Sequence, residues 1–163
     1  RGAAINSQNS SGNTPIFRAV RNNDIETIEL LMKGGADLNV TNQEGNTPLY
    51  TAVCLSENET VRKILEANPS SVHIKNNQHD SCLHRAIYRG DLRIFNTIIE
   101  KIDDVNIVDG NGDTPLHVAV NLDQLDMVNI LLEKGAKKDS INLYGKKPID
   151  LAHFEEMRKK LNS

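Results

Sequence analysis

The stretch that decides the fold is DGNGDTPLHVAVNLDQLDMVNILLEKGA, residues 109–136. Thr114 can cap a helix that opens on Pro115, because a proline at the first helical position lacks an N–H that would be unpaired in any case. Apolar residues three and four apart predict one buried face on this helix and another on the helix that follows. Gly135 provides the left-handed backbone that ends the second helix. Such a helix pair cannot bury both faces alone, so it needs similar units beside it.

The same pattern recurs along the chain in steps of 33 or 34 residues. Every copy opens on a polar residue, most copies continue with proline, and each holds an alanine in the same register. The copies begin with Thr14-Pro15-Ile16-Phe17, Thr47-Pro48-Leu49-Tyr50, Ser81-Cys82-Leu83-His84, Thr114-Pro115-Leu116-His117 and Lys147-Pro148-Ile149-Asp150, and their alanines are Ala19, Ala52, Ala86, Ala119 and Ala152. This period and the Thr-Pro-Leu-His-x-Ala signature resemble those of ankyrin repeats over essentially the whole chain.

The resemblance implies an all-α fold, an ankyrin-repeat solenoid of helix-turn-helix units with short β-hairpin-like fingers. We expect one domain over residues 1–163, in which the tail of a preceding repeat (1–8) is followed by repeats 9–41, 42–75, 76–108 and 109–141 and a partial repeat 142–163. Helices are predicted near residues 14–22, 24–33, 47–55 and 57–67, with a single closing helix near 148–161. Because residues 1–6 read like 34–39, which close a repeat, we expect the chain to be a fragment of a longer protein.

The third repeat is the least regular. His79 stands where the other repeats hold a turn glycine, and Cys82 stands where they hold proline. If the backbone at residue 79 has positive φ, a residue other than glycine costs roughly 1 kcal/mol there. An extra residue also precedes this repeat, in the stretch Asn68-Pro69-Ser70-Ser71-Val72. The third repeat is therefore predicted to be the weak coupling point of the array.

Charge and composition narrow the class of partner. The net charge of −3 argues against nucleic acid. Residues 1–133 carry 11 basic and 18 acidic side chains, for a charge of −7, whereas residues 134–163 carry 8 and 4, for +4. The basic end is interpreted as the polar cap of a solenoid, and the alternative is a surface for an acidic partner segment.

The apolar runs and the cysteines indicate the cellular compartment. No apolar run approaches the roughly 18 residues of a membrane span, so membrane insertion is not expected. Cys54 and Cys82 lie in different repeats at non-equivalent positions, which is typical of unpaired thiols in a reducing compartment. The sequence therefore predicts an intracellular protein that is cytoplasmic or nuclear.

No catalytic, cofactor-binding or metal-binding site is predicted. His84 and His117 follow Ser81 and Thr114 by three residues, so each can hydrogen-bond back to a hydroxyl and brace its own turn. The DGNGD stretch at residues 109–113 imitates a calcium loop but lacks the later glycine and glutamate that such a loop needs. These residues are interpreted as structural, and we expect no enzyme activity and no cofactor.

The resemblance implies a binding face. In ankyrin repeats, the residues two and three places after the alanine and the fingertip residues line the concave side. The residues predicted to bind a protein partner are Arg21, Asn22, Gln43, Glu44, Leu55, Asn77, Gln78, Tyr88, Arg89, Asn111, Leu122, Leu143, Tyr144 and Lys146. Several of these are apolar or aromatic where the fold does not require it, although Leu55 and Leu122 have the alternative of packing on the adjacent repeat.

The expected function is protein–protein recognition by a monomeric, non-catalytic module. A first alternative is the recruitment domain of a larger enzyme or channel. A second is an inhibitor of a transcription factor, since the octapeptide DSCLHRAI at residues 80–87 resembles inhibitors of the NF-κB type. In the ankyrin family, asparagines at the places of Asn39 and Asn106 tie the turn between repeats, and some of them are hydroxylated by a dioxygenase.

Overall fold

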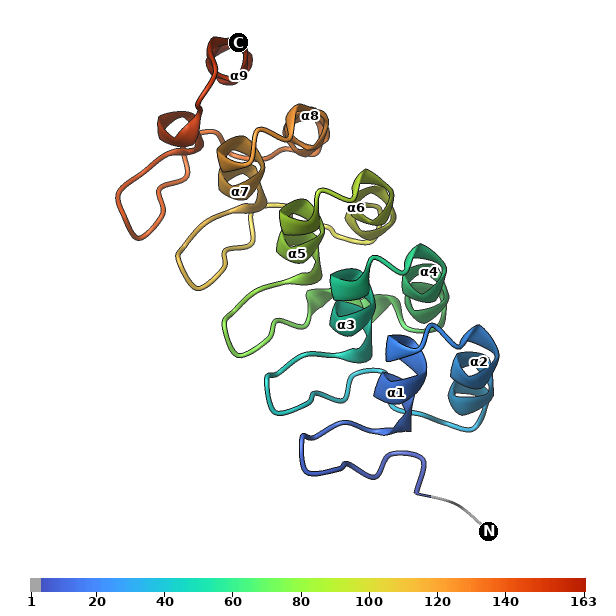
Figure 1. Cartoon of the computed structure of the whole chain (residues 1–163). Helices are drawn as coiled ribbons and strands as arrows, with labels where there is room; N and C mark the ends of the chain where they lie inside the picture. Colours follow the sequence, from blue (N-terminus) through green and yellow to red (C-terminus); the bar gives the residue numbers. More distant parts are fainter. Residues whose placement is uncertain (1–3) are drawn as a thin grey trace.

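The computed structural model of the chain describes residues 4–163 (Figure 1). Pairs of helices stack side by side, and a loop projects from the same edge of the stack before each pair. The inner helices, next to these loops, are α1 (Pro15–Arg21), α3 (Pro48–Leu55), α5 (Cys82–Arg89) and α7 (Pro115–Asn121). The outer helices are α2 (Ile25–Lys33), α4 (Asn58–Ala67), α6 (Leu92–Ile99) and α8 (Leu125–Glu133).

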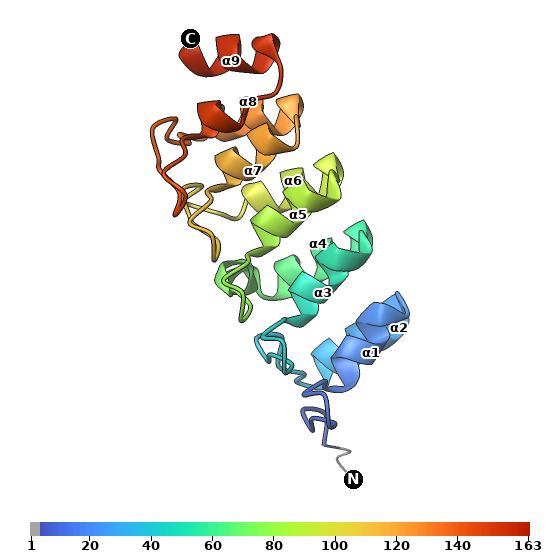
Figure 2. The ribbon, with the colours of Figure 1, turned by 60° about the vertical axis from the view of Figure 1, so that its left-hand side comes forward.

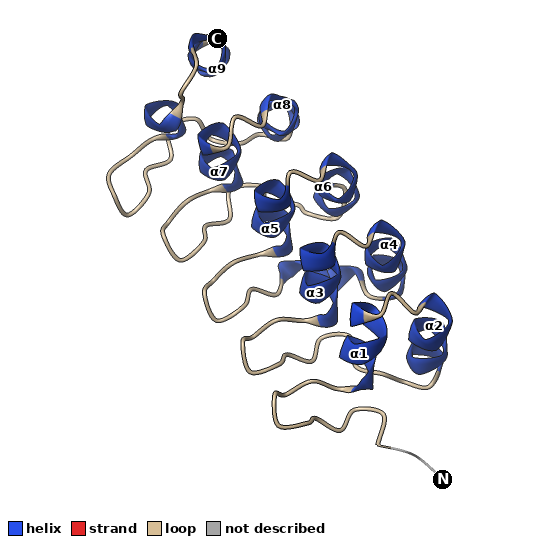
Figure 3. Ribbon diagram, viewed as in Figure 1, coloured by secondary structure: helices blue, strands red, loops and turns tan. Residues whose placement is uncertain are grey.

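The fold class predicted from the sequence is confirmed. Residues 4–163 contain no strand (Figure 3), and the helix pairs follow one another in a single file when the molecule is turned (Figure 2). Each inner helix packs against the inner helix of the next repeat, so every repeat contacts its sequence neighbours. This is the architecture of a solenoid, whose stability grows with the number of stacked units.

Capping side chains start most of the helices where the sequence predicts. The hydroxyls of Thr47, Ser81 and Thr114 accept the backbone N–H of the third residue that follows them. Asp24 and Asp91 cap the outer helices α2 and α6 in the same manner. These bonds satisfy N–H groups that have no partner within a helix, and each cap contributes about 1 kcal/mol.

The core lies between the inner and outer helices and consists of aliphatic side chains with small alanines between them. Ala52, Ala86 and Ala119 are completely buried, which allows adjacent inner helices to approach closely. Phe17 and Phe95 are the largest fully buried side chains of the described residues. An apolar core of this kind follows from the low aromatic content of 4%.

Each projecting loop carries a five-residue turn, which we call a finger. The fingers span residues 9–13, 42–46, 76–80, 109–113 and 142–146. In every finger the backbone N–H of the first residue donates to the carbonyl of the fifth residue. The carbonyl of the first residue accepts a hydrogen bond from the N–H of the fourth. The first residue's side-chain oxygen also accepts two backbone N–H groups of its own finger. The fingers are thus rigid turns rather than strands.

The predicted closing helix near residues 148–161 is wrong. A 3₁₀ turn, η2 (Pro148–Leu151), is followed by extended backbone at Ala152 and then by a separate helix, α9 (Glu155–Asn162). The break turns the chain so that Met157 and Leu161, one helical turn apart, are buried. The guanidinium of Arg158 also donates to the carbonyl of Ala152, at 3.1 and 3.3 Å. Periodicity alone did not reveal the break, because the apolar residues before and after it fit one helical pattern.

The extra residue before the third repeat is absorbed by a 3₁₀ helix, η1 (Pro69–His73), that the sequence analysis did not predict. Pro69 opens it, because the fixed φ of proline suits a first helical position. Val72 from this turn is completely buried. The insertion therefore adds to the core rather than bulging into solvent.

The start of the chain uses the same contacts as a repeat end. Asn6 accepts the N–H of Asp37 at 2.8 Å and donates to the carbonyl of Gly35 at 3.3 Å. Asn106 makes the equivalent bonds to Lys137 and Gly135. The repeat tail over residues 1–8 stays a prediction, and its first three residues lie outside the described part.

The backbone at His79 has φ of +58°, so the condition for a cost of a residue other than glycine is met there. We expect the double substitution His79→Gly and Cys82→Pro to raise the free energy of unfolding by about 1 kcal/mol or more, measured by urea denaturation. Ser81 already has the extended backbone (ψ 164°) that a following proline requires. If neither single variant is more stable than the parent, the third repeat is not limited by these two residues.

Candidate partner-binding groove

Two buried histidines connect the inner helices to the fingers that follow them. The Nε2 atoms of His84 and His117 lie 3.0 and 2.9 Å from the carbonyl oxygens of Asp113 and Lys146. In both histidines Nδ1 lies 2.8 Å from the capping hydroxyl of its own helix. Because a carbonyl only accepts, Nε2 carries the proton. Burial lowers the pKa of His84, which favours this neutral form. The predicted bracing role is confirmed and extended to the next repeat.

In the second repeat a tyrosine takes the place of these histidines. The hydroxyl of Tyr50 donates to Asp80 Oδ2 at 2.6 Å and accepts from Arg85 Nε at 2.9 Å. Arg85 also pairs with Asp80 at 3.5 Å, and its guanidinium carbon lies 5.4 Å from the centre of the Tyr50 ring. Burial and the hydrogen bond to Asp80 raise the pKa of Tyr50, so the phenol stays protonated. The three side chains fix the third finger to α3 and α5.

Four hollows lie between the inner helices and the fingers. The N-terminal hollow is lined by Ser7, Gln8, Asn9, Asn13, Thr14, Pro15, Arg18, Arg21 and Asn22. The Glu44 hollow is lined by Glu44, Asn46, Tyr50, Cys54, Asn76, Asn77, Gln78 and Arg85. The Asp80 hollow, of about 410 Å³, is lined by Gln78, Asp80, Arg85, Tyr88, Asp109, Gly110 and Asn111. The Tyr144 hollow, of about 210 Å³, is lined by Tyr88, Asp113, His117, Val118, Asn121, Asn142, Tyr144, Lys146 and Leu151.

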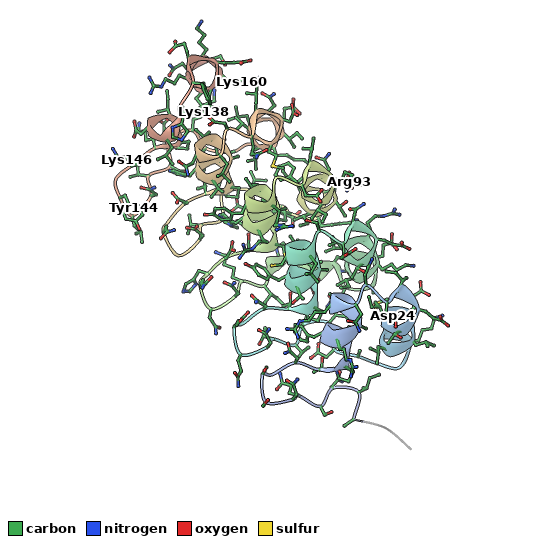
Figure 4. The ribbon with its side chains drawn as sticks, in the orientation of Figure 1. Asp24, Arg93, Lys138, Tyr144, Lys146 and Lys160 are labelled. Atoms are coloured by element: carbon green, nitrogen blue, oxygen red, sulfur yellow. The ribbon has the colours of Figure 1, made fainter. Side chains whose placement is uncertain are left out.

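The last three hollows form one continuous surface, which we call the finger groove. Gln78 and Arg85 belong to both the Glu44 and Asp80 hollows, and Tyr88 belongs to both the Asp80 and Tyr144 hollows. Figure 4 places Tyr144 and Lys146 on the last finger, at the C-terminal end of this surface. The groove thus follows the fingers from the second to the fifth repeat.

The fourteen predicted binding residues divide into two groups. Nine line a hollow: Arg21 and Asn22 the N-terminal one, and Glu44, Asn77, Gln78, Tyr88, Asn111, Tyr144 and Lys146 the finger groove. Gln43, Leu55, Arg89, Leu122 and Leu143 line none of these four hollows. Gln43 and Arg89 instead bond within the protein, to Ser10 and Ser56. Leu55 and Leu122 are partly exposed, at 42% and 37%.

Tyr88 stands at the centre of the groove. Its side chain is 44% exposed, so the fold does not bury it as a core residue. Partial burial, followed by the charges of Asp109, Asp80 and Asp113, raises the pKa of Tyr88 to about 12. The tyrosine therefore offers a neutral aromatic face in an acidic part of the groove.

Sequence reasoning missed the contribution of Tyr50, Asp80 and Arg85. Arg85 precedes the register alanine by one residue, whereas the predicted binding positions follow the alanine. A signal was available, because Arg18 and Arg85 occupy this same place in different repeats. Both arginines line hollows.

Nothing in this groove resembles a catalytic centre. The ring nitrogens of His84 and His117 both make structural hydrogen bonds. Among the described residues, no three His, Cys, Asp or Glu side chains are grouped so that they could hold a metal ion. Cys54 and Cys82 are free thiols, and burial raises the pKa of both. In the part of the chain that the structure describes, every helix is too short or too polar to cross a membrane.

The sequence model of the family described as ankyrin repeats (3 copies) matches residues 1–76 and 55–142. The chain belongs to the ankyrin-repeat family. Ankyrin repeats are protein-interaction modules, which agrees with the exposed side chains of Tyr88 and Tyr144 in the groove.

Three relatives match different lengths of this chain. The human transient receptor potential cation channel subfamily A member 1 is 37% identical over 150 residues, which cover 90% of this chain and 13% of the channel. The rat protein phosphatase 1 regulatory subunit 12A is 29% identical over 103 residues, 57% of this chain and 10% of that protein. The ankyrin and IPT/TIG repeat-containing protein of Schizosaccharomyces pombe is 49% identical over 55 residues, 34% of this chain and 5% of that protein. The chain thus spans about a tenth of the longer proteins that it matches.

Asn39 and Asn106 occupy the places at which family members tie the turn between repeats, but the two side chains make different hydrogen bonds in this chain. The side-chain amide of Asn106 binds the backbone of the next repeat, donating from its nitrogen to the carbonyl of Gly135 and accepting at its oxygen from the N–H of Lys137. Asn39 instead accepts a hydrogen bond from the side chain of Asn68, at 2.8 Å. The difference follows from the altered tail of the second repeat, where Asn68 stands in place of a glycine.

Proposed function

We propose that this chain is a non-catalytic module that binds a protein partner in the finger groove. The observation that carries the proposal is the Tyr144 hollow, which brings Tyr88, Tyr144 and Lys146 together from two repeats. Tyr144 is 71% exposed, and its hydroxyl lies 3.4 Å from Asn111 Oδ1. Exposed aromatic side chains beside a cation are typical of interface hot spots.

The partner would be recognised along several repeats at once. The finger groove extends over four repeats, so an extended segment of the partner can contact residues from each of them. The basic C-terminal end, which includes Lys138 and Lys160 (Figure 4), is a second surface for an acidic part of the same partner. We further propose an intracellular location, which the free thiols of Cys54 and Cys82 support.

A second candidate is the recruitment domain of a larger protein. It is favoured by two relatives, a cation channel and a regulatory subunit of a phosphatase, in which the matching region is about a tenth of the whole. The two candidates are compatible, because a recruitment domain also works by binding a protein. The inhibitor of a transcription factor stays a prediction from one octapeptide.

We expect Tyr88→Ala and Tyr144→Ala each to weaken partner binding by about 1–3 kcal/mol, because they remove aromatic contact area at an exposed site. Affinity capture with quantitative mass spectrometry identifies proteins held by the wild type, and calorimetry with the purified partner gives the Kd of each variant. Circular dichroism should show both variants folded.

The matched control is Phe154→Ala, which removes an aromatic side chain of 61% exposure that lies beside Leu125 and Met157, outside the groove. It should bind within twofold of the wild type. If both tyrosine variants also bind at wild-type affinity, the partner does not use the finger groove.

A further inference from the structure

A side-chain amide joins neighbouring fingers at three of the four junctions. Its nitrogen belongs to the first residue of a finger and donates to the last side chain of the preceding finger. The three bonds are Asn42 to Asn13 at 3.4 Å, Asn76 to Asn46 at 3.1 Å, and Asn142 to Asp113 at 2.7 Å. At the remaining junction the donor position holds Asp109 and the acceptor position holds Asp80. Two carboxylates cannot make this bond, since neither carries a donor when ionised.

A backbone bond is missing at the same junction. Elsewhere the second residue of a finger donates its N–H to the third residue of the preceding finger: Gln43 to Ser11, Asn77 to Glu44, and Leu143 to Asn111, at 3.0–3.1 Å. Among residues 4–163, the corresponding bond from Gly110 to Gln78 is not made. The third and fourth fingers therefore lack two hydrogen bonds that the other junctions make, although the backbone of Gly110 lies close to the carbonyl of Gln78. The Asp80 hollow lies beside this junction.

The unmade bonds leave a buried acceptor beside this hollow. Asp80 is only 8% exposed, and its Oδ1 is buried with no hydrogen-bond partner in the described chain. Its other oxygen accepts from Tyr50 and faces Arg85. Buried polar atoms of native proteins are nearly always paired. Asp80 therefore brings a carboxylate charge to the wall of the hollow that its own hydrogen bonds compensate on one oxygen and not on the other.

The charges around the hollow favour a cationic donor. Asp80 and Asp109 line the hollow itself, and the adjoining one is lined by Asp113 and Lys146. The positive charge of Arg85 is already engaged by Asp80 and Tyr50. Asp109 uses Oδ1 for two N–H groups of its own finger, which leaves Oδ2 for a ligand. The ring of Tyr88 forms another part of the wall and can receive a cation over its face.

We propose that the Asp80 hollow binds the side chain of a lysine or arginine of the protein partner. The cationic group donates to Asp109, lies against Tyr88, and offsets the charge of Asp80, for which this junction provides no amide. Two carboxylates and an aromatic ring suit an ammonium or guanidinium, whereas a metal ion would require a larger group of ligands than the described residues contain. The inference rests on the proposed function, because it assigns the chemistry of one partner residue within the same groove.

The substitution Asp109→Asn tests the missing amide. It restores the donor found at Asn42, Asn76 and Asn142, and its Oδ1 can still accept the bonds of its own finger. We expect the Tm to rise by about 2–4 °C in differential scanning calorimetry. The control Asp103→Asn removes the same charge from an exposed side chain outside the groove and should leave the Tm unchanged. A Tm of Asp109→Asn at or below that of the wild type contradicts the inference.

Binding is tested with peptides selected by the wild-type protein from a random twelve-residue phage library. We expect the selected peptides to share a lysine or arginine at one position. For the tightest peptide, fluorescence anisotropy gives the Kd before and after that residue is changed to norleucine. The change should weaken binding to the wild type and to Asp103→Asn at least tenfold, but weaken binding to Asp109→Asn less than twofold. An aspartate at residue 109 would thus lower the stability of the fold relative to asparagine and strengthen the binding of a cationic side chain.

The outcomes separate this inference from the proposed function. In one outcome the peptides bind, and Tyr88→Ala or Tyr144→Ala weakens their binding. If the change to norleucine then raises the Kd equally for the wild type and for Asp109→Asn, the groove binds peptides and only the cation site is refuted. If peptides bind without any response to the two tyrosine variants, the groove itself is wrong. If no peptide is selected, both the cation site and peptide binding in the groove are contradicted.

Discussion

Replacing His117 with alanine should lower the free energy of unfolding by about 3–4 kcal/mol, as large aromatic-to-alanine changes in cores do. The ring is completely buried, and its two nitrogens connect the cap of α7 to the carbonyl of Lys146 in the last finger. The alanine leaves a cavity and an unpaired buried carbonyl, and an unpaired carbonyl alone costs about 1–3 kcal/mol. Urea denaturation followed by circular dichroism measures the loss.

Two further variants test the reason for this loss. His73→Ala removes an exposed histidine from η1 and should change stability by less than about 0.5 kcal/mol. His117→Gln keeps an amide that can donate toward the finger, so it should recover part of the stability. A loss of under 1 kcal/mol in His117→Ala would falsify the view that this histidine couples α7 to the finger.

Much of the fold could be predicted because each repeat repeats the same local rules. The capping Thr114, the proline after it and the left-handed Gly135 are local signals, and the structure bears out all three. The positive φ of His79 was also predictable, since glycines hold this place in the other repeats. Local signals do not, however, show where a segment of helical periodicity is broken into two helices. The single helix predicted for the C-terminal end is in fact η2 and α9.

The groove was harder to predict, because its properties arise between repeats. Tyr88 and Tyr144 are separated by 56 residues in the sequence, yet they line one hollow. The pairing of Tyr50 with Asp80 likewise joins residues from two repeats. A comparison of residue 109 with its equivalents in the other repeats would have shown that the amide is missing. The effect of this difference could not be predicted, because the sequence does not show which side chains meet across a junction between fingers.

The junction between the second and third fingers makes both of the bonds that the junction at Asp109 lacks, and Gly45→Ala should show how much its packing contributes. We expect this substitution to lower the free energy of unfolding by about 3 kcal/mol or more, since a left-handed alanine costs about 1–2 kcal/mol and each lost hydrogen bond about 1 kcal/mol. Gly45 has φ of +77°, and an added Cβ would lie 2.6 Å from the backbone nitrogen of Asn77. The third finger would have to move, which breaks the bonds of Asn77 to Glu44 and Gln43.

The matched control is Gly145→Ala in the last finger. Gly145 has nearly the same backbone, with φ of +71°, but an added Cβ would meet no atom within 4 Å. Its cost should therefore be the left-handed backbone alone, about 1–2 kcal/mol. The difference between the two variants, measured by urea denaturation, isolates the contact between fingers. Equal losses would mean that neighbouring fingers do not stabilise one another at this junction, and the bonds missing at Asp109 would then have no effect on stability.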